Sequence, residues 1–187
     1  MTRATDTRAP TELHVGSTLA DKIWGTTRIG IGLVFLWAFF DKLLSLGFAT
    51  GRLEDGSIDF LGEAAWINGG SPTYGFLNFG TAGPFAEFFQ GFAGAAWADW
   101  LFMLGLLGIG LALTFGFAVK LGAYLGALML MLMFFAALPP EHHPFLDDHV
   151  IYSIVLLGLA EVNAGDTFGV GRWWSKTPVV ERYPILR

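Results

Sequence analysis

Residues 101–138 decide the fold, and they read LFMLGLLGIGLALTFGFAVKLGAYLGALMLMLMFFAAL. The stretch holds a single charged residue, Lys120, with Gly116 and Gly122 on either side of it. A membrane-spanning helix needs roughly 20 mostly apolar residues, so one continuous helix of this length would greatly exceed a bilayer. The stretch therefore predicts two spanning helices, over about 97–119 and 121–138, joined by a tight hairpin at Lys120.

Two further apolar stretches flank this hairpin, at about 23–46 and 149–164. The second is short enough to be a soluble core helix, but the other three spans favour a fourth crossing. The sequence thus predicts an all-α integral membrane protein, a four-transmembrane-helix bundle. The expected division is a polar tail at 1–20, a membrane domain at 21–164 and a second tail at 165–187.

The composition agrees with a chain surrounded by lipid. Of the 187 residues, 53% are hydrophobic and 14% are charged, whereas an ordinary soluble domain is about 25% charged. The chain has no cysteine, which excludes disulfides, thiolate metal sites and cysteine nucleophiles. The net charge of −5 offers no basic surface for nucleic acid.

Lysine and arginine predict the orientation, because cytoplasmic flanks carry more of them. With the N-terminus inside, the outer flanks hold only Lys42 and Arg52. Both tails are therefore expected in the cytoplasm, with the protein in the cell membrane. The basic residues of the inner flanks are Arg3, Arg8, Lys22, Lys120, Arg172, Lys176, Arg182 and Arg187.

The first outer loop, residues 47–96, has an acidic part, a turn-rich part that begins at Asn68, and an aromatic part at 84–92. Pro84 suits a first helical position, and phenylalanines follow at helical spacing. This predicts a short amphipathic helix on the outer membrane surface. Two roles stay open for the loop, which either caps the bundle or gates access to a substrate.

Polar residues at the outer ends of three spans are expected to meet in one cluster. His149 and Tyr152 share a helix face, and histidine exchanges protons near neutral pH while carboxylates relay them. Such a cluster would suit proton-coupled redox chemistry. Asp147 and Asp148 also suit capping of the fourth helix. The candidate catalytic residues are Asp41, Lys42, Asp99, Asp148, His149 and Tyr152.

A metal site competes with this interpretation, because His142, His143 and His149 lie close together beside two aspartates. Imidazole and carboxylate suit zinc, copper or iron. The adjacent pair does not match the i, i+4 spacing of helical ligands, and no short zinc motif is present. No metal is therefore predicted.

Charges within a span are functional candidates, and two of them lie near the inner ends of the first and fourth spans. Arg28 and Glu161 are expected at similar depth, which predicts a buried ion pair. A proton-transfer or quinone-contact role is the alternative. The candidate cofactor-binding residues are Arg28, Glu161 and Asn68.

Several stretches resemble the DoxX family of small membrane proteins. They are WINGGSPTYGFL at 66–77, LPPEHHPFLDDH at 138–149, RIGIGLVFLW at 28–37 with Asp41-Lys42 after it, and ADWLFMLG at 98–105. The resemblance covers nearly the whole chain beyond about Ala20. It implies a small four-span membrane protein.

The same resemblance implies a redox role, since DoxD is the membrane subunit of a thiosulfate:quinone oxidoreductase and works with a second subunit, DoxA. The expected cofactor is membrane quinone as electron acceptor, and the expected partners are the lipid bilayer and a second redox subunit. A non-catalytic scaffold that docks a redox partner is the alternative. A solute carrier is disfavoured because the chain has no internal repeat.

Small residues in the middle spans allow close helix contacts. Gly105, Gly108 and Gly110 lie in the second span, and Gly122 and Gly126 lie in the third. Packing inside the bundle is the favoured interpretation. A homo-oligomer is the other one.

Overall fold

The computed structural model describes residues 18–140, 143 and 145–187. Regular structure in these residues is helical, apart from one isolated antiparallel bridge between Arg52 and Ile58. The long helices are α1 (Leu19–Leu44), α4 (Ala96–Phe115), α5 (Val119–Ala136) and α6 (Asp148–Glu161). The short elements are η1 (Trp66–Asn68), α2 (Tyr74–Phe79), η2 (Gly83–Phe85), α3 (Ala86–Gln90), η3 (Ala164–Asp166), α7 (Gly171–Trp174), α8 (Pro178–Arg182) and η4 (Pro184–Leu186).

Three helices, α1, α4 and α5, are long and apolar enough to cross a membrane. This confirms the prediction of an all-α chain with apolar helices suited to a bilayer. The helix α6 has 14 residues, fewer than the roughly 17 that a spanning helix usually needs. The predicted tail at 1–20 lies almost entirely outside the described residues.

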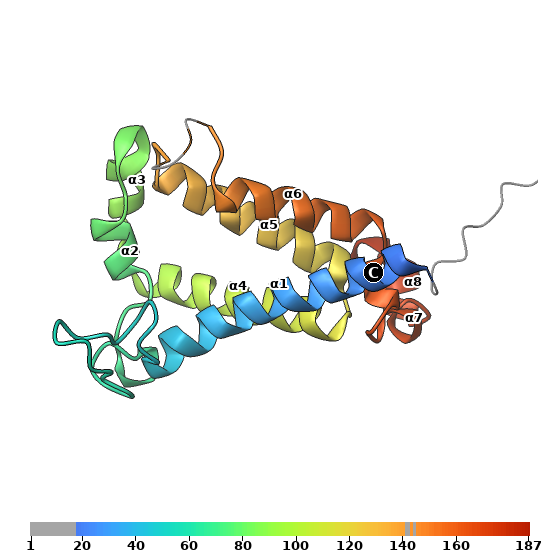
Figure 1. Ribbon diagram of the computed structural model, residues 1–187, viewed down its shortest axis with the longest axis horizontal. Coiled ribbons are helices and arrows are strands. Elements are labelled where there is room, and N and C mark those ends of the chain that lie inside the picture. Colours follow the sequence, from blue (N-terminus) through green and yellow to red (C-terminus); the bar gives the residue numbers. More distant parts are fainter. Residues whose placement is uncertain (1–17, 141–142, 144) are drawn as a thin grey trace, which may run out of the picture.

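The long helices are arranged in two layers (Figure 1). In one layer α1 packs on α4, in the other α5 packs on α6, and the contact between α4 and α5 joins the two. We call the end at which α1 ends and α4 and α6 begin the loop end. We call the opposite end, where α4 turns into α5, the tail end.

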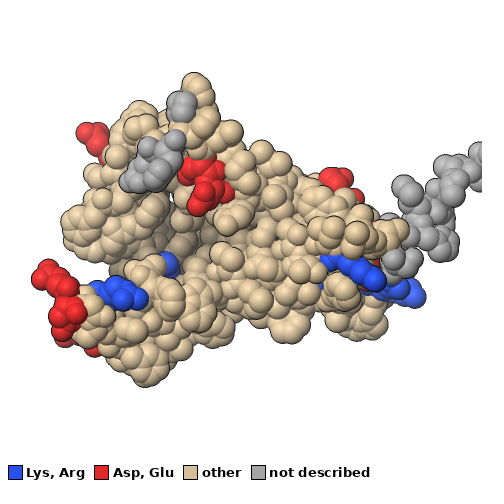
Figure 2. Space-filling view, viewed as in Figure 1, with Lys and Arg blue, Asp and Glu red and all other residues tan. Residues whose placement is uncertain are grey.

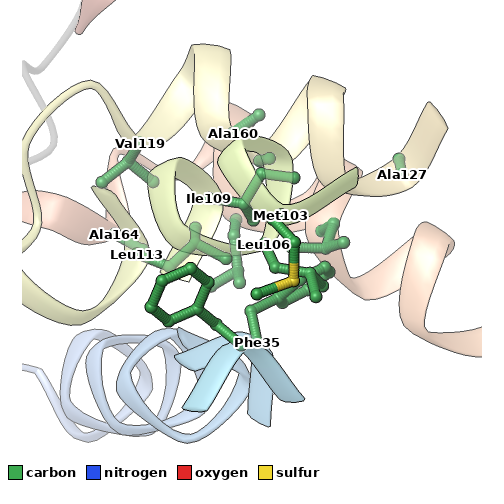
Figure 3. Close-up of a cluster of buried hydrophobic side chains, with 13 residues drawn as sticks. Phe35, Met103, Leu106, Ile109, Leu113, Val119, Ala127, Ala160 and Ala164 are labelled. Atoms are coloured by element: carbon green, nitrogen blue, oxygen red, sulfur yellow. The ribbon is translucent and has the colours of Figure 1, made fainter. Parts of the chain in front are cut away.

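A continuous apolar core joins the two layers. Figure 3 shows Phe35 of α1 near Met103, Leu106 and Ile109 of α4, and all four side chains are buried. The helices α1 and α4 approach closely at Gly32, where an added Cβ would lie 2.6 Å from the backbone nitrogen of Thr114. This close contact brings side chains of α1 within reach of the backbone of α4.

The turn between α4 and α5 lies at 116–118, not at Lys120 as the sequence suggested. Gly116 ends α4 with a φ of +79°, a left-handed conformation that glycine adopts without strain. Its α-carbon also faces Arg28, Gly165 and Gly169, and an added Cβ would lie 3.0 Å from each. Lys120 lies in the first turn of α5, and its backbone N–H donates to the backbone oxygen of Arg187 at 2.7 Å.

The aromatic part of the first loop forms η2 and α3, near the predicted position, and packs across the loop end (Figure 1). Phe89 of α3 is buried with Leu77 of α2 and Ala136 of α5. Phe88, on the other side of α3, is 68% exposed. The short helix therefore has the amphipathic character that the sequence predicted.

Ser45, the residue that ends α1, offers a test of local strain. It has a φ of +59°, is fully buried, and its hydroxyl has no hydrogen-bond partner among the described residues. Replacing Ser45 with Gly is expected to raise the free energy of unfolding by about 1 kcal/mol, because it removes both the left-handed strain and an unsatisfied hydroxyl. Ser45→Ala removes only the hydroxyl and should gain less. Thermal unfolding measures both, and a destabilised S45G protein would contradict the account.

Candidate functional site

Asp41 anchors the chain that leaves α1 at the loop end. Its side chain is 1% exposed. One carboxylate oxygen accepts the backbone N–H of Phe48 at 3.0 Å, and the other accepts that of Ala49 at 2.9 Å. Both oxygens are therefore bonded to the loop backbone, so this predicted catalytic residue holds the start of the loop in place.

Lys42 follows Asp41 on the helix and points in a different direction, because successive helical residues are about 100° apart. Its ammonium nitrogen lies 5.9 Å from the centre of the Phe102 ring of α4. This is the distance of a cation–π contact. Within the described residues, Lys42 has no carboxylate at salt-bridge distance.

Asp99 lies in the first turn of α4 and ties the turn-rich part of the first loop to that helix. One of its carboxylate oxygens accepts the Ser71 hydroxyl at 2.9 Å, the Thr73 hydroxyl at 2.6 Å and the Thr73 N–H at 3.1 Å. The side chain is buried. Asp99 thus holds the loop, as Asp41 does.

The start of α6 carries a hydrogen-bonded histidine and aspartate. Asp147 caps the helix by accepting the N–H of Val150 at 3.2 Å, and its second oxygen lies 2.6 Å from Nδ1 of His149. Both side chains are about one quarter exposed. Asp148 is exposed in the first turn, and Tyr152, one turn further along, is 43% exposed. The predicted capping role is confirmed for Asp147.

The predicted single cluster is wrong, because its residues fall into two sets in different layers. The helix α1 packs on α4 while α6 packs on α5. No hydrogen bond or ion pair joins the sets within the described residues. The prediction rests on the alternating directions of the helices, which give the depth of each residue in the membrane. They do not say which helices lie next to one another. The first set is Asp41, Lys42 and Asp99, and the second is Asp147, Asp148, His149 and Tyr152.

The surface at the loop end is hollowed between the two layers (Figure 2). Basic side chains and an acidic patch beside them lie on one side of this hollow, and further acidic side chains lie on the other side in the same view. The two sets of polar residues therefore belong to opposite layers of one end of the molecule. A molecule at this end could contact both layers.

The histidines do not assemble a metal site within the described residues. No group of three histidine, aspartate or glutamate side chains there has the geometry to hold an ion. Nδ1 of His143 accepts the backbone N–H groups of Phe145 and Leu146 at 3.1 and 3.0 Å, so it serves the loop. His142 lies outside the described residues.

Asn68, a predicted cofactor contact, uses its amide within the loop. It donates to the backbone oxygens of Leu61 and Gly62 and is exposed. In the acidic part of the same loop, hydrogen bonds from the hydroxyl and then the backbone N–H of Ser57 lower the pKa of Asp55. That carboxylate therefore stays ionised at neutral pH and keeps the loop surface acidic.

Arg28 is fully buried at the tail end, and its partners among the described residues are backbone oxygens. Its guanidinium donates to Leu113 and Thr114 in the last turn of α4. It also donates to Ala164, Thr167 and Phe168 in the segment after α6, at 3.0–3.1 Å. An arginine has five N–H donors, and all five are used. A quinone contact would require one of these bonds to be exchanged.

The predicted ion pair between Arg28 and Glu161 is wrong. Glu161 is 66% exposed at the end of α6, where it accepts the Tyr124 hydroxyl at 2.8 Å and lies 3.8 Å from the Lys120 ammonium. The carbonyl groups at the end of α4 carry partial negative charge and suit a cation. Arg28 therefore obtains its stabilisation from the backbone without a carboxylate.

Sequence reasoning missed the residues that complete these contacts. Ser71 and Thr73 bind Asp99, and Tyr124 and Lys120 bind Glu161. The first pair lies in a turn-rich stretch that the sequence singled out, although nothing there indicated which helix it contacts. Lys120 and Tyr124 are four residues apart and share one helix face, which is a signal that could have been used.

The arrangement offers one pair suited to proton exchange at the loop end. A carboxylate bonded to Nδ1 fixes the orientation of an imidazole. This leaves Nε2 of His149 to exchange a proton with a bound molecule. The other buried carboxylates of this end, Asp41 and Asp99, are occupied by loop N–H and O–H groups.

Comparisons with known proteins give no relative for this chain. No protein-family model matches it, and neither does a curated protein or a solved structure. The family assignment and the redox role accordingly stay predictions.

Proposed function

We propose that the chain is the membrane subunit of a quinone-linked oxidoreductase of the DoxX/DoxD type. The observation that carries the proposal is the 2.6 Å contact between His149 and Asp147, at the end of the molecule where the surface is hollowed between the layers. In this proposal α6 crosses the membrane beside α5 as a fourth span, and both tails lie in the cytoplasm. The excess of basic residues toward the tail end supports that orientation.

The chemistry explains why a proton donor is needed. Reduction of a quinone to a quinol takes up two electrons and two protons. Oxidation of two thiosulfate ions to tetrathionate releases two electrons and no proton. The protons must therefore reach the quinone from water through the protein, and His149 is suited to deliver them. The chain has no cysteine, so the electrons come from a small reductant such as thiosulfate or from a partner subunit.

The proposal predicts that His149→Gln slows quinone reduction at least tenfold, because a general acid contributes about 10²-fold or more. The assay is anaerobic, thiosulfate-dependent reduction of a soluble quinone by the purified protein in detergent. The matched control is His143→Gln, which changes a histidine of the loop before α6 whose Nδ1 accepts backbone N–H groups. It should retain most of the activity.

Two outcomes would contradict this role. A folded wild-type protein without quinone reduction would exclude an autonomous oxidoreductase for this substrate pair. Equal losses in H149Q and H143Q would mean that neither histidine transfers the proton.

The first of those outcomes would favour a non-catalytic scaffold that docks a redox partner. Asp41 and Asp99 support this second candidate, because both buried carboxylates serve to hold the first loop. A loop fixed in this way presents a defined surface. The same wild-type preparation would then serve as bait for the partner subunit.

A further inference from the structure

Lys42 lies at the loop end, and its side chain is partly buried. Its ammonium has no hydrogen-bond partner among the described residues. The neighbouring carboxylate of Asp41 is bonded through both oxygens to Phe48 and Ala49. Asp99 accepts from Ser71 and Thr73 through one of its two oxygens. Both oxygens of the adjacent carboxylate are thus bonded to the loop, and the Lys42 ammonium lies against an aromatic ring.

The place of this ammonium limits what can neutralise it. Lys42 lies two residues before the end of α1, a helix long and apolar enough to cross a membrane. Large apolar side chains near it on the same helix, Trp37 and Phe40, are 49% and 43% exposed. Exposed aromatic side chains at the end of a span lie at the level of lipid headgroups. A lysine at that level meets the phosphate of a lipid.

The Phe102 ring gives the position a second feature of a binding site. A ring face 5.9 Å away holds the ammonium between α1 and α4, without supplying the hydrogen-bond acceptors that its three N–H groups require. A charged side chain within a span is costly unless it is paired. The charge of the adjacent Asp41 carboxylate acts on Lys42, but both of its oxygens already accept from the loop backbone. An anion that reaches this point from the bilayer supplies the missing acceptors.

We propose that Lys42 is the centre of a binding site for a phosphate-type oxyanion at the loop end of α1 and α4, and that the ligand is the headgroup of an anionic lipid. A lipid phosphate accepts from the ammonium, while Phe102 holds the lysine side chain in place. The site does not depend on quinone chemistry, so a protein without quinone reductase activity would still have it.

The test is native mass spectrometry of the full chain with phosphatidylglycerol and phosphatidylcholine in competition. The wild-type protein is expected to prefer phosphatidylglycerol, and Lys42→Met is expected to lower that preference about fivefold, the effect of one basic side chain at a lipid surface. Lys42→Arg keeps the charge and should keep the preference. The matched control is Arg52→Met, which removes an exposed charge from the same end.

A second arm separates a lipid headgroup from a free anion. Thermal unfolding is measured in phosphatidylcholine nanodiscs with inorganic phosphate or with chloride at equal ionic strength. If phosphate stabilises the wild-type protein but not K42M, while the wild type shows no preference for phosphatidylglycerol, Lys42 binds a soluble oxyanion. In that case the assignment of a lipid headgroup is overturned. The site itself is overturned if the wild-type protein shows neither a preference for phosphatidylglycerol nor stabilisation by phosphate. It is also overturned if K42M and R52M change these two measurements equally. Lys42→Gln replaces K42M if that variant does not fold.

Discussion

Replacing Arg28 with Met is expected to lower the free energy of unfolding by about 4 kcal/mol, enough to unfold a large share of the protein. The methionine fills similar space but leaves five backbone oxygens of α4 and of the segment after α6 without donors. A hydrogen bond to a charged group contributes about 1.5–3 kcal/mol, and relief of the desolvation of the buried guanidinium offsets part of the sum. Unfolding in mixed micelles with increasing sodium dodecyl sulfate, followed by tryptophan fluorescence, measures the change.

Two variants show whether the backbone contacts of Arg28 are responsible. Arg28→Lys keeps the charge but has three donors in place of five, so it should lose stability by an intermediate amount. Glu161→Gln should change stability by less than about 0.5 kcal/mol, since Glu161 is exposed. If E161Q were as unstable as R28M, the two residues would be an ion pair after all, and the carbonyl contacts would not be the main term.

Replacing Asp41 with Ala is expected to cost about 3 kcal/mol, the second largest effect. The substitution leaves the partly buried N–H groups of Phe48 and Ala49 without their acceptor, the buried Asp41 carboxylate. Each buried donor without a partner costs about 1–3 kcal/mol. Hydrogen exchange of these two amides should also become much faster, and this readout locates the damage at the end of α1.

Asp41→Asn and Glu54→Ala are the controls for that experiment. Asparagine keeps one acceptor oxygen, so it should hold one of the two N–H groups and lose less stability. Glu54 is an exposed carboxylate of the same loop, and its removal should change little. Unchanged exchange at Phe48 and Ala49 in D41A would show that the carboxylate does not hold the loop.

The apolar runs were sufficient to predict the central helices. The run around Lys120 predicted α4 and α5 within four residues at each end, because a long apolar stretch in lipid has few alternatives to a helix. The turn lies at 116–118 and not at Lys120, since the left-handed Gly116 ends α4. A charge marks the membrane surface, whereas backbone conformation sets where the helix stops.

The candidate site was less predictable, because its contacts are made with the backbone. Arg28 binds five carbonyl groups, and every residue has a carbonyl, so no sequence pattern marks those partners. A search for side-chain partners led instead to Glu161. The pair of Asp147 and His149 is local, within three residues, and capping patterns did indicate that Asp147 would begin a helix.

The difference in length between α1 and α6 has a consequence for the surrounding bilayer. At about 1.5 Å per residue, the 26 residues of α1 extend about 39 Å and the 14 residues of α6 about 21 Å. The hydrocarbon of a bilayer is about 30 Å thick, and mismatch is relieved by tilting the longer helix and thinning the lipid beside the shorter one. With α6 in the membrane, the two sides of the protein would meet lipid of unequal thickness, which favours short-chain lipids against α6.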